Sequence, residues 1–82
     1  MIASISGKVT HVGLGDLIVE ASGVGYSIFV TTKLALEVRV GSEVALRTAH
    51  IVREDAQALY GFSNSEELAA FNLLCSVSGV GP

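Results

Sequence analysis

Apolar and polar residues alternate with a period of two through most of the first three quarters of the chain. The clearest stretch is residues 24–30, in which the even-numbered positions are apolar and share one face, and residues 44–52 show a similar pattern. Because successive side chains of a strand point to opposite faces, this period is typical of half-buried β-strands. The alternation therefore predicts strands for this part of the chain.

Turn-forming residues interrupt the alternation at Gly13-Leu14-Gly15-Asp16, Ser22-Gly23, Gly41-Ser42 and Arg53-Glu54-Asp55. The segments between them predict strands at residues 2–12, 17–21, 24–30, 43–52 and 57–62. An open sheet of five such short strands would leave unpaired edges, so we expect a small closed barrel or a sandwich. Residues 32–38 are expected to hold a helical turn capped by Thr32.

After Phe62 the period of the pattern changes from two to three or four. Ser63-Asn64-Ser65-Glu66 is typical of a capping box, in which the Ser63 hydroxyl caps the helix and Glu66 reaches back. An apolar stripe of about three turns follows, formed by Leu68, Phe71 and either Leu74 or Cys75. We therefore predict a mainly β protein with a carboxy-terminal helix.

The last residues, Ser78-Gly79-Val80-Gly81-Pro82, combine a glycine-rich turn with a proline, which is favoured at the first position of a helix. This order predicts a second helix after the turn. We expect residues 1–62 to form the barrel domain and residues 63–82 to be the first helix and hairpin of a second, truncated domain.

Composition limits the partners and the cellular compartment. Five Lys and Arg against eight Asp and Glu give a net charge of −3, so no bulk attraction to nucleic acid or anionic lipid is expected. The longest apolar runs are too short to span a bilayer. The first residues lack the pattern of a secretory signal, and the single Cys75 cannot form an internal disulfide. We expect a cytoplasmic protein.

No residues are spaced as an enzyme's catalytic or metal-binding group would require. His11 and His50 are 39 positions apart without a carboxylate or cysteine at metal-ligand spacing, and Cys75 falls on the apolar stripe. A nucleotide-binding Gly-Lys-Ser/Thr loop is also missing from the sequence. We predict a non-catalytic chain without metal or cofactor.

Two features are candidates for contact with nucleic acid. Gly79-Val80-Gly81-Pro82 could present helix-start amides to a phosphate without any cation, or could be a plain loop between helices. Glu54 and Asp55 could be a solvated turn, or could repel phosphates. Two unit charges about 4 Å apart repel by only about 1 kcal/mol in water, so several copies around a symmetry axis would be needed for a large effect.

Three blocks of the sequence resemble one family. They are Gly23-Val24-Gly25-Tyr26, residues 52–62, and Phe71 and Leu74 followed by Ser78-Gly79-Val80-Gly81-Pro82. In order and spacing they are similar to the amino-terminal part of the RuvA family, the Holliday-junction-binding subunits of the bacterial branch migration complex.

The resemblance implies a five-stranded OB-fold barrel followed by the start of a helix-hairpin-helix domain. It implies a homotetramer, or an octamer of two tetramers, that holds four-way junction DNA open and planar in recombination and repair. Glu54 and Asp55 match the family's acidic pin at the junction centre. Gly79, Val80, Gly81 and Pro82 match the hairpin whose backbone amides hold duplex phosphates.

The resemblance also implies a motor partner. The family docks the RuvB ATPase through a carboxy-terminal domain that this chain does not contain, so ATP hydrolysis for branch migration would occur on the partner. Two alternatives stay open. One is an OB module that binds single strands on exposed aromatics, although Tyr26, Tyr60 and Phe62 are expected to face the core. The other is a purely structural oligomerisation domain.

Overall fold

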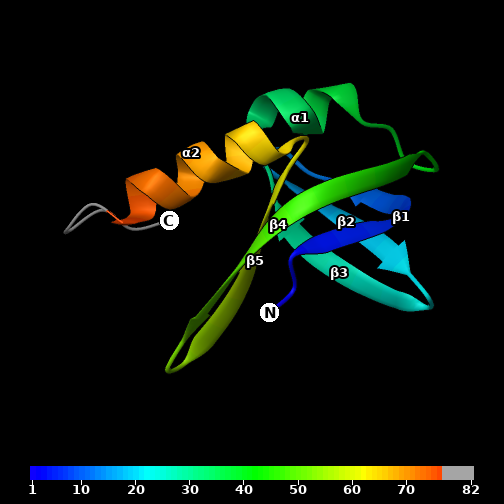
Figure 1. The fold of residues 1–82 in the computed structure, drawn as a ribbon. Coiled ribbons are helices and arrows are strands. Elements are labelled where there is room, and N and C mark those ends of the chain that lie inside the picture. Colours follow the sequence, from blue (N-terminus) through cyan, green and yellow to red (C-terminus); the bar gives the residue numbers. More distant parts are fainter. Residues whose placement is uncertain (77–82) are drawn as a thin grey trace.

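The computed structural model describes residues 1–76, which fold into a β-barrel with a short helix beside it and a longer helix after it (Figure 1). The elements are β1 (Ser4–Val12), β2 (Asp16–Ala21), β3 (Val24–Phe29), α1 (Thr32–Glu37), β4 (Glu43–Arg53), β5 (Ala56–Phe62) and α2 (Ser65–Ser76). The five predicted strands and the helical segment before β4 are confirmed, with strand ends that differ by one or two residues.

The strands close into a barrel in the order β1-β2-β3-β5-β4. Neighbours are antiparallel except β3 and β5, which are parallel and pair only at Ile28 with Leu59 and at Phe29 with Tyr60. This five-stranded arrangement is an OB-fold. It confirms the barrel, rather than the sandwich, among the two architectures that the strand pattern allowed.

Strand β1 completes the barrel because it pairs on both sides. Lys8 lies opposite Glu43 on β4 and also opposite Glu20 on β2. A Cβ atom at Gly7 would overlap the carbonyl oxygen of Glu20, so only glycine allows the strands to approach this closely. The close approach of β1 to β2 at this position therefore depends on a residue without a side chain.

Alternate residues of the strands fill the barrel. The fully or largely buried cluster is Ile5, Val9, Leu17, Val19, Ile28, Leu46 and Leu59. The buried Thr48 is satisfied because its hydroxyl donates a 2.7 Å hydrogen bond to the carbonyl of Ile2. Thr48 and its neighbour Ala49 point to opposite faces of β4, and both are buried. Ala49 pairs with Tyr60 and lies on the face where α2 packs against β4 and β5.

The prediction that Tyr60 and Phe62 face the barrel core is wrong. Leu59 and Gly61 of β5 are buried, whereas Tyr60 and Phe62 alternate with them and contact Phe71 of α2 from outside the barrel. The strand therefore has apolar residues on both faces, because one face fills the barrel and the other receives the helix.

The cap predicted for α1 is wrong by one residue. The side-chain oxygen of Thr31, not Thr32, accepts a 3.1 Å hydrogen bond from the Leu34 backbone N–H. Thr31 has an extended backbone and Thr32 is already helical, which is the geometry of a cap and the first helical residue.

The cap predicted for α2 is also displaced by one residue. Asn64 Oδ1 accepts a 2.9 Å hydrogen bond from the Glu67 N–H, and the Glu67 carboxylate accepts one of 3.2 Å from the Ser63 N–H. Ser63 and Glu66 therefore do not form the predicted box. Asn64 caps the helix instead, and Glu67, three residues later, reaches back to the N–H of the residue before this cap.

The apolar stripe of α2 lies partly against the barrel. Leu68, Phe71 and Cys75 are half-buried, while Leu74 is 61% exposed, so Cys75 completes the stripe. Neither helix between residues 1 and 76 combines the length and the apolar composition that crossing a membrane requires.

Candidate functional site at the β4–β5 hairpin

Beyond the barrel, β4 and β5 continue as a two-stranded arm. The two strands pair from Arg47 with Phe62 to Arg53 with Ala56, but the last pairs that β5 makes with β3 are at Leu59 and Tyr60. Residues 51–58, which we call the hairpin arm, therefore have no third strand beside them. Figure 1 shows the arm projecting away from the barrel to a tip that is remote from α1.

Glu54 and Asp55 form the two-residue turn at the tip of the hairpin arm. Both side chains are exposed, and so is that of the preceding Arg53. The structure thus places the sequence-predicted carboxylates side by side in the chain at the outermost point of the arm. Their exposure leaves both carboxylates accessible to an approaching charge.

The turn at the tip differs from the other two-residue hairpin turn. Ser22 and Gly23, between β2 and β3, have φ values of 52° and 83°, the left-handed pair that the twist of a hairpin favours. Neither Glu54 nor Asp55 is among the positive-φ residues of the described chain. No left-handed backbone therefore restricts the side chains at the tip, and carboxylates can occupy both positions.

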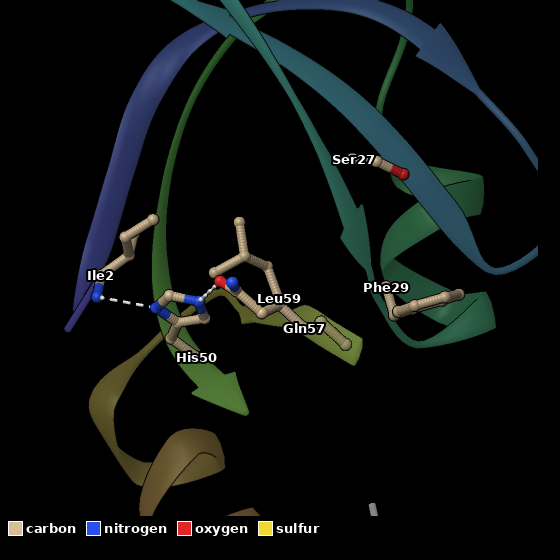
Figure 2. Close-up of a pocket in the computed structure, with 7 residues that line it drawn as sticks. Ile2, Ser27, Phe29, His50, Gln57 and Leu59 are labelled. Atoms are coloured by element: carbon tan, nitrogen blue, oxygen red, sulfur yellow. Dashed lines mark hydrogen bonds between the residues drawn. The ribbon is translucent and has the colours of Figure 1, made fainter. Parts of the chain in front are cut away.

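A hydrogen-bonded chain crosses the root of the hairpin arm (Figure 2). The Ile2 N–H points at Nδ1 of His50 at 3.4 Å, and Nε2 of the same ring lies 2.9 Å from Oε1 of Gln57. Because Nδ1 accepts, the ring proton is on Nε2 and is donated to Gln57. The Thr48 N–H also donates to the carbonyl of Ala3, at 3.0 Å. These contacts join the amino-terminal segment, β4 and β5.

An open cavity of about 410 Å³ lies beside this chain of hydrogen bonds. Its lining includes Ile2, Ser27, Phe29, His50, Gln57 and Leu59. It is located where β3 and β5, which pair only at residues 28–29 and 59–60, no longer lie side by side. The sequence did not predict this cavity, because its walls come from four separate segments of the chain.

The aromatic rings at the other side of β5 are largely occupied by one another. Tyr60 is 5.4 Å from Phe29 and 5.2 Å from Phe71 between ring centroids, and Phe62 is 5.0 Å from Phe71. Phe29 remains 50% exposed. A continuous stacking platform for a single strand is therefore not formed by these rings.

Comparison with known proteins identifies the barrel. The sequence profile of the RuvA N terminal domain matches residues 1–61 of this chain. The chain belongs to the RuvA family. The profile ends at the buried Gly61 of β5, so it covers the barrel and the whole hairpin arm of this RuvA-family chain.

Curated relatives in the RuvA family match the full 82 residues. The relative from Clavibacter michiganensis subsp. michiganensis is 50% identical, and the chain covers 38% of its length. Those from Mycolicibacterium gilvum and Mycobacterium tuberculosis are 48% and 49% identical, each with 42% of its length covered. All three are named Holliday junction branch migration complex subunit RuvA. The chain thus spans about two fifths of the length of these relatives.

The remaining candidate residues of this RuvA-family chain are dispersed. His11 is exposed on β1, His50 is at the root of the hairpin arm, and Cys75 is half-buried on α2. Within residues 1–76, no three His, Cys, Asp or Glu side chains gather as a metal site would require. The predicted phosphate-binding turn, Gly79-Val80-Gly81-Pro82, lies outside the described residues.

Proposed function

We propose that this chain supplies the OB-fold barrel and the acidic pin of a non-catalytic subunit that binds four-way junction DNA. The observation that carries the proposal is the position of Glu54 and Asp55, exposed at the tip of an arm that projects from the barrel of a RuvA-family chain. Relatives about 50% identical over the full chain are named as subunits of a Holliday junction branch migration complex.

The acidic pair acts by repelling phosphates. Each copy of the chain adds two carboxylates at the tip of its arm, and copies related by rotational symmetry bring these tips toward a common axis. One pair of charges about 4 Å apart in water contributes only about 1 kcal/mol, so the effect depends on the number of copies and on exclusion of water. Strands at the junction centre are deflected around the tips and stay apart.

Duplex arms are held by a different part of the chain. Gly79, Val80, Gly81 and Pro82 form the turn of the first helix-hairpin-helix in this proposal, and their backbone amides bind duplex phosphates without reading sequence. Residues 1–62 then act as the barrel domain, and residues 63–82 begin the domain that contacts DNA. A net charge of −3 does not oppose this division, because amides at a helix start carry partial positive charge.

The partners follow from the same proposal. The subunit assembles as a homotetramer in the cytoplasm and acts in recombination and DNA repair. The RuvB motor ATPase is its partner, docked through a carboxy-terminal domain, and the ATPase site is on that partner. No residue of this chain is assigned to ATP hydrolysis.

The direct test is a gel-shift titration of the full-length protein with a four-way junction and with a linear duplex of equal length. We expect the junction to bind at least about tenfold more tightly, a difference of about 1.4 kcal/mol. Equal affinities for the two DNAs would contradict the proposal. A single-stranded oligonucleotide in the same titration tests the stacking alternative, which predicts the tightest binding for that probe.

Light scattering separates the proposal from a purely structural oligomerisation domain. The proposed subunit forms an assembly whose mass rises by that of one junction when DNA is added. An assembly that forms but leaves the mass unchanged in the presence of junction DNA would support the structural alternative.

A further inference from the structure

Residues 1–3, which we call the amino-terminal strap, lie along β4 at the root of the hairpin arm. The ladder between β1 and β4 ends at Ser4. Beyond it, the carbonyl of Ala3 accepts a 3.0 Å hydrogen bond from the Thr48 N–H, and the carbonyl of Ile2 accepts one of 2.7 Å from the Thr48 hydroxyl. The Ile2 side chain packs against the buried core cluster. The strap is therefore anchored to the barrel beside β4.

His50 extends this connection to the second strand of the arm (Figure 2). It pairs with Leu59 in the ladder between β4 and β5, and Gln57 lies two residues nearer the tip on the same face of β5. The ring faces the Ile2 N–H with Nδ1, 3.4 Å away, and its Nε2 lies 2.9 Å from Oε1 of Gln57. This bridge of side chains links the strap to a residue that is two positions from Asp55.

The two faces of the arm's root are supported differently. On the outer face, α2 packs against β4 and β5, and Tyr60 stacks on Phe71 of the helix. On the inner face, the His50 bridge connects the strands to the strap. Because a two-stranded ribbon has little stability by itself, the direction of the arm depends on such contacts at its root.

We propose that His50, as a neutral ring, is a positioning residue that fixes the direction of the hairpin arm. The direction of the arm sets where Glu54 and Asp55 stand relative to the barrel, because these residues form its tip. The consequence for DNA rests on the proposed function, in which the two carboxylates hold strands apart.

The bridge requires one acceptor and one donor on the same ring, which is the neutral imidazole with its proton on Nε2. A protonated ring carries N–H groups on both nitrogens. Its Nδ1–H would then face the Ile2 N–H, so the bond to the strap would be lost. The contact with Gln57 would persist, since Oε1 still accepts from Nε2. Protonation therefore releases the arm from the strap, and the bridge is present at higher pH and lost as the pH falls.

The charged groups around the ring are few. The strap brings the α-amino group of Met1, which is one residue from the Ile2 N–H. Apart from His50 itself, none of the described residues that line the adjoining cavity is charged or titratable. Glu54 and Asp55 follow four and five positions later, at the tip. Histidine is the side chain that ordinarily changes charge between about pH 5 and 8, so mild acid acts on the bridge before it acts on the tip.

The direction of the arm can be measured without DNA. Spin labels are attached at Ala56→Cys beside the tip and at Ser6→Cys on β1, both exposed positions, in full-length protein without other cysteines and diluted into unlabelled protein. We expect a narrow distribution of label distances at about pH 7.5 and a broader one at about pH 5.5. His50→Phe removes both ring nitrogens and should give the broad distribution at both pH values. Gln57→Leu removes the acceptor at Oε1 and should broaden the distribution at the higher pH.

His11→Phe is the matched control, because His11 is the second histidine of the chain and is exposed on β1. It should keep the pH dependence of the unmodified protein. His50→Phe retains the Met1 amino group and both tip carboxylates, so its loss of pH dependence assigns the effect to the ring. The pH comparison in the unmodified protein needs no substitution at the ring and holds even if a variant folds poorly. A distribution that stays narrow in His50→Phe, or that ignores pH in the unmodified protein, would overturn the inference.

Gel-shift titrations of the same full-length proteins connect the arm to DNA. The ratio of junction to duplex affinity should fall several-fold at the lower pH, and in His50→Phe at both pH values, but not in His11→Phe at the higher pH. Broadening of the label distances in a protein without any junction preference would contradict the proposed function and leave the role of His50 in place. A junction preference that is unchanged while the arm broadens would overturn the link between arm direction and discrimination.

Discussion

Tyr60 on β5 and Phe71 on α2 stack with their ring centroids 5.2 Å apart and their planes 30° from parallel. This contact connects a barrel strand to the helix that follows the barrel. A helix of 12 residues has little stability by itself in water, so α2 depends on such packing. The aromatic residues on the outer face of β5 therefore help to hold α2 against the barrel.

We expect Phe71→Ala to lower the free energy of unfolding by about 1–2 kcal/mol, because it removes a half-buried ring and its aromatic contacts. The helical signal in far-ultraviolet circular dichroism should fall before the barrel unfolds. Leu74→Ala on the exposed side of the same helix is the control and should change stability by no more than about 0.5 kcal/mol. Equal effects of the two variants would mean that α2 does not pack through Phe71.

The interior of the barrel should reject a methyl group at Gly61. A Cβ atom there would lie 2.7 Å from Cγ2 of Ile28 and 3.2 Å from Cδ1 of Leu46. Ile28 is buried and its branched Cβ restricts rotation, so it cannot easily move aside. We expect Gly61→Ala to cost about 1–3 kcal/mol in urea unfolding.

Gly25→Ala is the matched control for this glycine. A Cβ atom at Gly25 would be 3.4 Å from the Ile18 side chain, its nearest neighbour, and the residue is exposed on β3. Its stability should stay within about 0.5 kcal/mol of the unmodified protein. If Gly61→Ala is tolerated as well as Gly25→Ala, the barrel interior is less tightly packed than the structure indicates.

The two candidate caps of α2 can be separated by paired substitutions. Asn64→Ala removes the acceptor of the 2.9 Å bond from the Glu67 N–H and should cost about 1 kcal/mol in thermal unfolding. Ser63→Ala keeps the backbone N–H that donates to Glu67, so it should be close to neutral. A larger loss in Ser63→Ala than in Asn64→Ala would restore the cap that the sequence pattern suggested.

The sequence predicted the strands well because a small barrel imposes its period on every strand. The sequence predicted the cap of α2 less well, because two patterns overlap there. Ser63 with Glu66 and Asn64 with Glu67 have equal spacing, and only the hydrogen bonds in the structure identify Asn64 as the cap. Alternation separates Leu59 and Gly61 from Tyr60 and Phe62, but it does not say which set is inside when a helix covers the other face.

The candidate site was predictable only in part. Glu54 and Asp55 are contiguous and stand between two apolar strands, so the hairpin tip was evident from the pattern. The root cavity was not, because Ile2, Ser27 and His50 come together through barrel closure, which no local spacing encodes. The projection of the arm has the same origin, since it depends on where β3 stops pairing with β5.

The acidic tip gives the most direct test of the electrostatic role. Replacing Glu54 with Gln and Asp55 with Asn removes two negative charges while keeping side-chain size and exposure. Loss of phosphate repulsion should tighten binding to linear duplex by about 1 kcal/mol or more, which is about fivefold, and so reduce discrimination between junction and duplex. Gel-shift titrations with both DNAs measure this change.

The control for this double substitution is Glu37→Gln with Glu43→Gln. It removes the same charge from exposed positions on α1 and at the start of β4, outside the hairpin arm. If the tip acts locally, the control shifts both affinities slightly and equally, and added salt removes that shift because exposed charges are screened over about 10 Å at 0.1 M. The tip variant should retain its loss of discrimination at the same salt, since charges gathered at a confined junction centre are screened less. Weaker junction binding by the neutral tip, or identical behaviour of the two variants, would show that Glu54 and Asp55 are turn residues without a role in holding strands apart.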